Sequence, residues 1–158
     1  RRIRVRGLVQ GVGFRPHVYR CAQRFLLSGF VANGPEGVLI EAEGEDLDAF
    51  VAALHEELPP LARIDSLLQV PLVNSGEPGF RSDSTLSGAA AGAAIPAYTS
   101  ICDSGLQLLF DTENRSYLHP FIDCCDCGRR YTLSRALPYD RDTTSMADFK
   151  LCPECELE

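Results

Sequence analysis

The first 83 residues alternate between stretches of two-residue and of helical periodicity. Every second residue from position 3 to position 9 is apolar or glycine, which predicts a strand with one buried face. Apolar residues at helical spacing predict one helix over about 15–28, closed by Gly29, and a second over about 46–58. Further strands are predicted over 29–33, 38–43 and 64–73, with a short edge strand over 79–83. The order βαββαβ is that of a ferredoxin-like α+β fold.

The first predicted helix should turn one apolar face toward the sheet. Cys21 lies on this face, so we expect it to be a core residue rather than a reactive thiol. The residues expected to be buried with it are Phe14, Val18, Ala22, Phe25 and Leu26.

A glycine-rich turn joins the first strand to the first helix, with the sequence Gly7-Leu8-Val9-Gln10-Gly11-Val12-Gly13-Phe14-Arg15. Backbone N–H groups converge at the start of a helix, where the helix dipole also favours an anion. Arg15 adds a planar cation that matches a phosphate or carboxylate. A dinucleotide fingerprint is disfavoured because its third glycine is absent, although a tight turn that binds nothing stays an alternative for a bare Gly-x-Gly. The expected phosphate-binding residues, which we call the cradle, are Gln10, Gly11, Val12, Gly13, Phe14 and Arg15.

This turn closely resembles the signature of the acylphosphatases, and a second match follows at Gly29-Phe30-Val31-Ala32-Asn33. The resemblance implies the ferredoxin-like fold and hydrolysis of a carboxyl–phosphate anhydride without a metal or a covalent intermediate. It implies that Arg15 neutralises charge on the phosphoryl oxygens and that Asn33 orients the attacking water. A plain turn residue before Gly34 is the alternative for Asn33.

The charges of the chain are unevenly distributed. The net charge is −7, yet residues 1–35 carry seven arginines and no acidic residue, while residues 36–60 carry eight acidic residues and no Lys or Arg. The early arginines should help an anionic small substrate reach Arg15, and the acidic balance disfavours nucleic acid as a partner. No apolar run approaches the roughly 20 residues of a membrane span, and no signal peptide is recognisable, so we expect a cytoplasmic protein without a membrane partner.

The composition of the chain changes after residue 83. Residues 84–96 are small and uncharged and predict a flexible linker, followed by a second unit over 97–158. Six of the seven cysteines lie in that unit, including Cys124-Cys125-Asp126-Cys127 and Cys152-Pro153-Glu154-Cys155. Two Cys-x-x-Cys pairs favour structural zinc. A disulfide pairing or a redox dithiol is the alternative.

The chain as a whole resembles the N-terminal region of the HypF family, the carbamoyltransferases that mature [NiFe]-hydrogenases. That resemblance implies an acylphosphatase domain followed by two four-cysteine zinc fingers, with carbamoyl phosphate as the substrate. It implies further domains of the same enzyme and hydrogenase-maturation proteins as partners. The chain is then a fragment of such an enzyme or a shortened relative. The strings that carry the resemblance include Phe121-Ile122-Asp123-Cys124, Leu137-Pro138-Tyr139-Asp140-Arg141, Met146-Ala147-Asp148-Phe149 and the final Cys-x-x-Cys pair.

The predicted zinc ligands form incomplete sets. The family pattern has a Cys-x-x-Cys pair where this chain has Cys102-Asp103-Ser104-Gly105, so one thiolate is replaced by glycine. The first finger keeps Cys102, Cys124 and Cys127, with Cys125, Asp103 or His119 as candidates for a fourth contact. The second finger keeps Cys152 and Cys155, whose expected partners would lie beyond Glu158.

A second hypothesis is a non-catalytic interaction module that keeps the acylphosphatase fold for docking. The presence of both Arg15 and Asn33 argues against it, and the missing zinc ligand argues mildly for it.

Overall fold

The computed structural model describes residues 1–74, 76, 78–83, 101–119, 122, 133–136, 140–150 and 153. Five strands form one mixed sheet in the spatial order β4-β1-β3-β2-β5. All neighbouring strands are antiparallel except β5, which runs parallel to β2. The ferredoxin-like fold is therefore confirmed. The strands are β1 (Arg2–Leu8), β2 (Ser28–Gly34), β3 (Gly37–Glu43), β4 (Arg63–Val70) and β5 (Phe80–Ser82).

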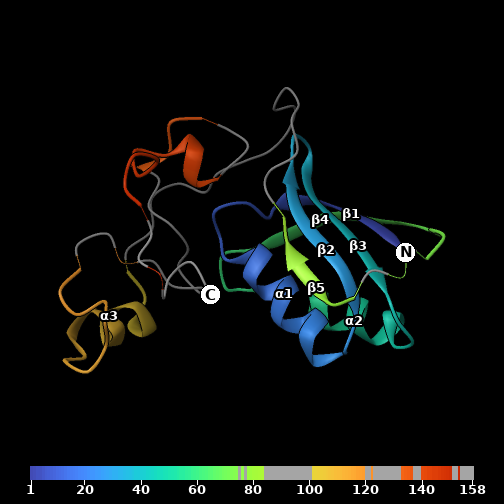
Figure 1. Cartoon of the computed structure of the whole chain (residues 1–158), viewed down its shortest axis with the longest axis horizontal. Helices are drawn as coiled ribbons and strands as arrows, with labels where there is room; N and C mark the ends of the chain where they lie inside the picture. The colour runs from blue at the N-terminus through green and yellow to red at the C-terminus, as the bar shows by residue number, and fades with distance from the viewer. Residues whose placement is uncertain are drawn as a thin grey trace.

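Two helices, α1 (Phe14–Arg24) and α2 (Leu47–Glu56), lie on the same side of this sheet (Figure 1). The alternation in β1 turns Ile3 and Val5 into the layer between sheet and helices, where both are buried. Phe25, directly after α1, packs edge to face against Phe50 of α2, with ring centroids 6.4 Å apart. Cys21 is buried in the same core, as predicted.

The C-terminal end of α1 differs from the prediction. The helix ends at Arg24 rather than near residue 28, because Leu26 adopts a left-handed conformation with φ of 53°. The Leu27 N–H donates to the Ala22 carbonyl and the Leu26 N–H donates to the Gln23 carbonyl, which together form a Schellman cap. Leu26 is 90% exposed, so its predicted burial is wrong, and Leu27 is the residue that enters the core. Gly29 does not close the helix but belongs to β2.

Two other boundaries also move. The second helix was expected over 46–58, but α2 ends at Glu56. The fourth strand was expected to reach residue 73, but β4 ends at Val70. Both shifts are small enough to leave the topology unchanged.

Among the described residues beyond the sheet are a helix that the sequence did not predict, α3 (Asp103–Phe110), and a short 3₁₀ helix, η2 (Arg141–Thr143). A weak signal for α3 exists, since Leu106, Leu109 and Phe110 have helical spacing. The predicted linker over 84–96 lies outside the described residues. Within the described part of the chain, no helix has the length and apolar character needed to cross a membrane.

Candidate active site

The cradle contains two glycines in the left-handed region. Gly11 has φ of 70° and Gly13 has φ of 76°, values that a residue with a Cβ adopts only with strain. Gly13 is the N-cap of α1, and its carbonyl accepts the His17 N–H at 3.0 Å. Val12 and Phe14 alternate with these glycines and are buried, so the loop is anchored in the core. The predicted loop at the start of a helix is present, with its N–H groups in the place where an anion is favoured.

Arg15 lies in the first turn of α1, directly after this loop. Its side chain is 17% exposed, so the guanidinium is close to the surface but largely enclosed. Its Nη1 atom lies 3.5 Å from Oδ2 of Asp140, a residue beyond the sheet. No pattern in the sequence points to a role for Asp140, which stands only in the HypF-like string Leu137-Pro138-Tyr139-Asp140-Arg141.

Gln10 connects the cradle to the β2–β3 hairpin. Its buried Nε2 donates to the carbonyls of Gly34 and Gly37, each at 2.8 Å. The end of β1 lies beside the start of β3, with Val5 opposite Val38, so the loop and the hairpin share one end of the sheet. The Gln10 side chain thus positions the hairpin relative to the cradle.

Asn33 is the next-to-last residue of β2 and lies opposite Val38 in the hairpin. Its side chain is 1% exposed, and its Oδ1 atom is buried. Because Asn33 directly precedes Gly34, the hydrogen bonds of Gln10 hold the backbone beside it. Asn33, the last residue of the second acylphosphatase-like motif, therefore lies at the same end of the sheet as the glycine-rich turn.

His17 packs into the core behind the cradle. Its ring nitrogens lie 3.8 and 3.9 Å from the Cys21 sulfur, and its ring lies 6.0 Å from that of Phe14. Burial lowers the pKa of His17 and raises the pKa of the Cys21 thiol, so both groups favour their neutral forms. His17 and Cys21 thus belong to the buried face on which α1 packs.

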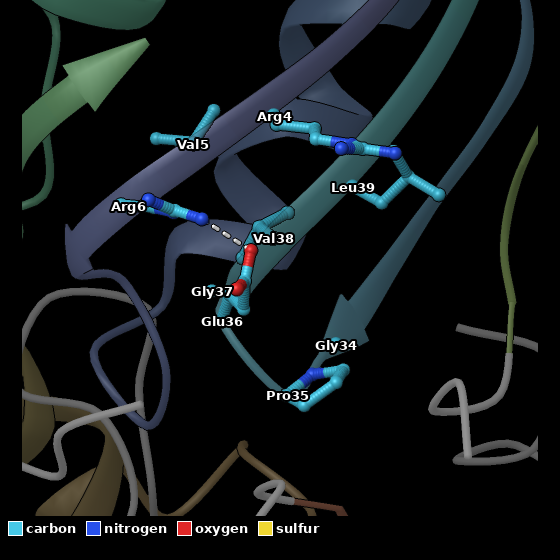
Figure 2. Close-up of a pocket in the computed structure, with 9 residues that line it drawn as sticks. All are labelled: Arg4, Val5, Arg6, Gly34, Pro35, Glu36, Gly37, Val38 and Leu39. Atoms are coloured by element: carbon cyan, nitrogen blue, oxygen red, sulfur yellow. Dashed lines mark hydrogen bonds and ion pairs between the residues drawn. The ribbon is translucent and has the colours of Figure 1, made fainter. Parts of the chain in front are cut away.

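A separate pocket of about 260 Å³ lies over β1 and the β2–β3 hairpin (Figure 2). Arg4, Arg6 and Pro35 line it, and Arg6 points toward Glu36, with which it forms an ion pair. Its described lining includes none of the residues from Gly11 to Arg15. The pocket is thus a second arginine-bearing surface, distinct from the cradle, with one of its two arginines neutralised by a carboxylate.

Only one of the predicted zinc ligands lies in the described residues. Cys102 is the N-cap of α3, and its sulfur accepts the Gly105 N–H at 3.3 Å. A Cβ placed on Gly105 would lie 3.6 Å from this sulfur but only 2.7 Å from Cγ1 of Ile101, so a cysteine at this position requires the Ile101 side chain to shift. No group of three or more potential ligands forms among the described residues. The predicted ligands Cys124, Cys127, Cys152 and Cys155 lie outside them.

Comparison with known proteins agrees with the geometry. The family model "Acylphosphatase" matches residues 1–81. The chain belongs to the acylphosphatase family. The chain is also 42% identical to the acylphosphatase of Geobacter sulfurreducens over 69 residues. This aligned stretch is 42% of this chain and 75% of that protein. The first resemblance is confirmed, and the protein is an enzyme of the acylphosphatase type.

The similarity to larger proteins extends over nearly the whole chain. The carbamoyltransferase HypF of Rhizobium leguminosarum bv. viciae is 49% identical over 146 residues, which are 92% of this chain and 19% of that protein. A crystal structure of full-length HypF, in a phosphate- and nucleotide-bound form, matches with a TM-score of 0.84 and 36% identity over 98% of this chain and 21% of that one. The resemblance of the chain to the N-terminal region of the HypF family is confirmed. The chain spans about a fifth of the length of the relatives that it matches in this way.

Proposed function

We propose that this acylphosphatase unit hydrolyses carbamoyl phosphate. The observation that carries the proposal is the position of Arg15, enclosed at the first turn of α1 directly after the glycine loop. Convergent N–H groups and a guanidinium at a helix N-terminus suit the doubly charged phosphoryl group of an acyl phosphate. The carbamoyl group is inferred from the larger relatives, which are named carbamoyltransferases. The unit would then act with the other domains of such an enzyme in the maturation of hydrogenases.

The proposed reaction is an in-line attack by water on phosphorus. A bond forms between the water oxygen and phosphorus, the bond from phosphorus to the bridging oxygen breaks, and carbamate leaves with the electron pair. The water protons pass to the phosphate product and to solvent. Arg15 and the N–H groups of the cradle stabilise the charge on the three phosphoryl oxygens, which is the main catalytic resource in such reactions. Asn33 orients the water through its side-chain amide.

The test is steady-state turnover of carbamoyl and acetyl phosphate by the wild type, Arg15→Ala and Arg20→Ala. Arg20 is an exposed arginine of the same helix and serves as the matched control for charge. Arg15→Ala should lower kcat/KM by about 10² or more, as expected for losing one preorganised donor, while Arg20→Ala changes it little. A wild type no faster than Arg15→Ala would reject the enzymatic proposal. Turnover of acetyl phosphate without turnover of carbamoyl phosphate would reject the proposed substrate.

The role of Asn33 requires a different measurement. Asn33→Ala should lower kcat more than it weakens inhibition by inorganic phosphate, because we assign Asn33 to the water and Arg15 to the anion. Equal losses in both quantities would assign Asn33 to phosphate binding instead.

We also propose that the unit beyond the linker binds at most one zinc per chain, and binds it weakly. A four-thiolate site holds zinc with about 10–16 kcal/mol near neutral pH, and Gly105 removes one thiolate from the first set. Gly105→Cys should raise zinc affinity, measured by competition with a chelator, and should leave acetyl phosphate turnover unchanged. Two tightly held zinc ions in the unmodified chain would contradict this proposal.

A further inference from the structure

A carboxylate from beyond the sheet lies against the arginine of the cradle. Oδ2 of Asp140 is 3.5 Å from Nη1 of Arg15, and the two side chains are 26% and 17% exposed. Other ion pairs on the sheet unit are more exposed, such as Arg24 with Glu57 at 50% and 48% and Arg6 with Glu36 at 58% and 53%. Exposed pairs contribute little and are poorly ordered, whereas enclosed pairs constrain the orientation of both groups. The Arg15–Asp140 pair is therefore suited to orient the guanidinium.

The turn around Asp140 fixes the direction of this carboxylate. Its Oδ1 accepts the Arg141 N–H at 2.8 Å, and the Asp140 N–H donates to the Thr143 hydroxyl at 3.0 Å. The Thr143 N–H donates in turn to the Asp140 carbonyl at 3.1 Å. With one oxygen used as the cap of η2, the other oxygen is the one that faces Arg15.

Asp140 lies outside the part of the chain that resembles independent acylphosphatases. The family model ends at residue 81, and the match to the Geobacter sulfurreducens acylphosphatase covers 42% of this chain. The similarity to the HypF proteins covers nearly all of it. The carboxylate is thus an addition to the common acylphosphatase site.

We propose that Asp140 is a positioning residue for Arg15 in acyl phosphate hydrolysis, an inference that rests on the proposed function. The separation of 3.5 Å between Nη1 and Oδ2 exceeds the roughly 2.7–2.9 Å of a tight charge-assisted hydrogen bond. A contact at this distance restricts the rotation of the guanidinium without holding it as tightly as a short charge-assisted hydrogen bond would, so a phosphate can still compete for it. The part of the chain beyond the sheet thereby contributes to turnover through Arg15.

The test compares Asp140→Asn with Asp142→Asn in the full chain. Asparagine keeps the size and the capping oxygen of Asp140 but removes its charge. Asp142 is an exposed aspartate in the same turn and is the matched control. Asp140→Asn should lower kcat for acetyl and carbamoyl phosphate by about tenfold, as misorientation of a catalytic group does. Inhibition by inorganic phosphate should become about two- to fivefold stronger, because a negative charge beside Arg15 is lost.

A double variant separates positioning from a structural effect. In the Arg15→Ala background, Asp140→Asn should change kcat less than twofold, since Asp140 acts through Arg15. An equal tenfold loss in that background, or kcat unchanged or increased in the single variant, would overturn the proposal. A thermal unfolding curve of Asp140→Asn that differs from that of Asp142→Asn would also overturn it. A wild type without Arg15-dependent turnover would reject the proposed function first.

Discussion

The sheet unit, residues 1–83, and the described residues from 101 onward are stabilised in different ways. The sheet unit buries one continuous apolar cluster between its strands and two helices. In the described residues from 101 onward, only Gly105, Ile122 and Thr144 are buried, while Phe110 and Phe149 are more than 60% exposed. Hydrogen bonds between near neighbours, such as those of Asp140 and Thr144, hold the turns of this second region.

The comparison shows how the two regions contribute to one site. The cradle is anchored by the core through Val12 and Phe14, so its geometry depends on the packing of the whole sheet unit. Asp140 is held by a local turn, so its geometry depends on a few hydrogen bonds. Changes in the first region should therefore affect folding and activity together, whereas changes in the second should affect activity alone.

The largest difference in the loss of stability is expected between alanine variants of two phenylalanines, one in each region. Phe50 is fully buried, and Phe50→Ala should lower the free energy of unfolding by about 3–5 kcal/mol. Phe149 is 62% exposed, and Phe149→Ala should change it by less than about 0.5 kcal/mol. Urea unfolding followed by circular dichroism measures both. Similar losses for the two variants would show that the second region has a core of its own.

A smaller contrast is expected between two buried polar side chains. Gln10→Ala removes both hydrogen bonds to the hairpin and leaves buried carbonyls unsatisfied, which should cost about 1–3 kcal/mol and lower acyl phosphate turnover. Thr144→Val removes the hydrogen bonds that the Thr144 hydroxyl makes to the Arg141 carbonyl and the Met146 N–H. The sheet unit should unfold at an unchanged urea concentration in this variant. A shift of that midpoint by Thr144→Val as large as that by Gln10→Ala would contradict the comparison.

Two leucines in the left-handed region provide a finer test. Leu26 has φ of 53° and caps α1, and Leu118 has φ of 54° in the second region. Glycine relieves the strain but adds entropy to the unfolded chain, so Leu26→Gly should stabilise the sheet unit by about 0.5–1 kcal/mol. Leu118→Gly should leave the same unfolding transition in place. Destabilisation by Leu26→Gly would show that the exposed leucine makes contacts that stabilise the helix end.

The smallest expected effect is a dependence on pH. The folded state lowers the pKa of His17 by burial, so the unfolded chain binds this proton more readily. The contribution of neutral His17 to the free energy of unfolding is therefore fully present above the ordinary histidine pKa of about 6.5. It is lost progressively as the pH falls below that value. His17→Gln should flatten the decline in unfolding free energy between about pH 7 and pH 5. A decline that is equally steep in His17→Gln would contradict the assignment of this pH dependence to His17.

The sequence predicted the sheet unit well because periodicity there reflects a real two-layer core. Ile3 and Val5 alternate with exposed arginines, and Phe50 and Leu54 follow helical spacing, so the pattern indicates the buried face directly. The predicted end of α1 was wrong because a leucine, not a glycine, adopts the left-handed conformation that ends the helix. Its place is set by the hydrogen bonds to the Ala22 and Gln23 carbonyls, which the sequence pattern does not show. Asp140 could not be predicted as part of the site, since no local pattern shows that it meets Arg15.

The most direct test of the account is to follow binding of inorganic phosphate by amide chemical shifts of the ¹⁵N-labelled chain, with chloride at equal ionic strength as the control. The cradle should show the largest saturable shifts, at Gly11, Val12, Gly13, Phe14 and Arg15. These shifts should largely disappear in Arg15→Ala. Saturable shifts centred on Arg4 and Arg6, which line the other pocket, or no saturable shift at all, would contradict the cradle as the phosphate site.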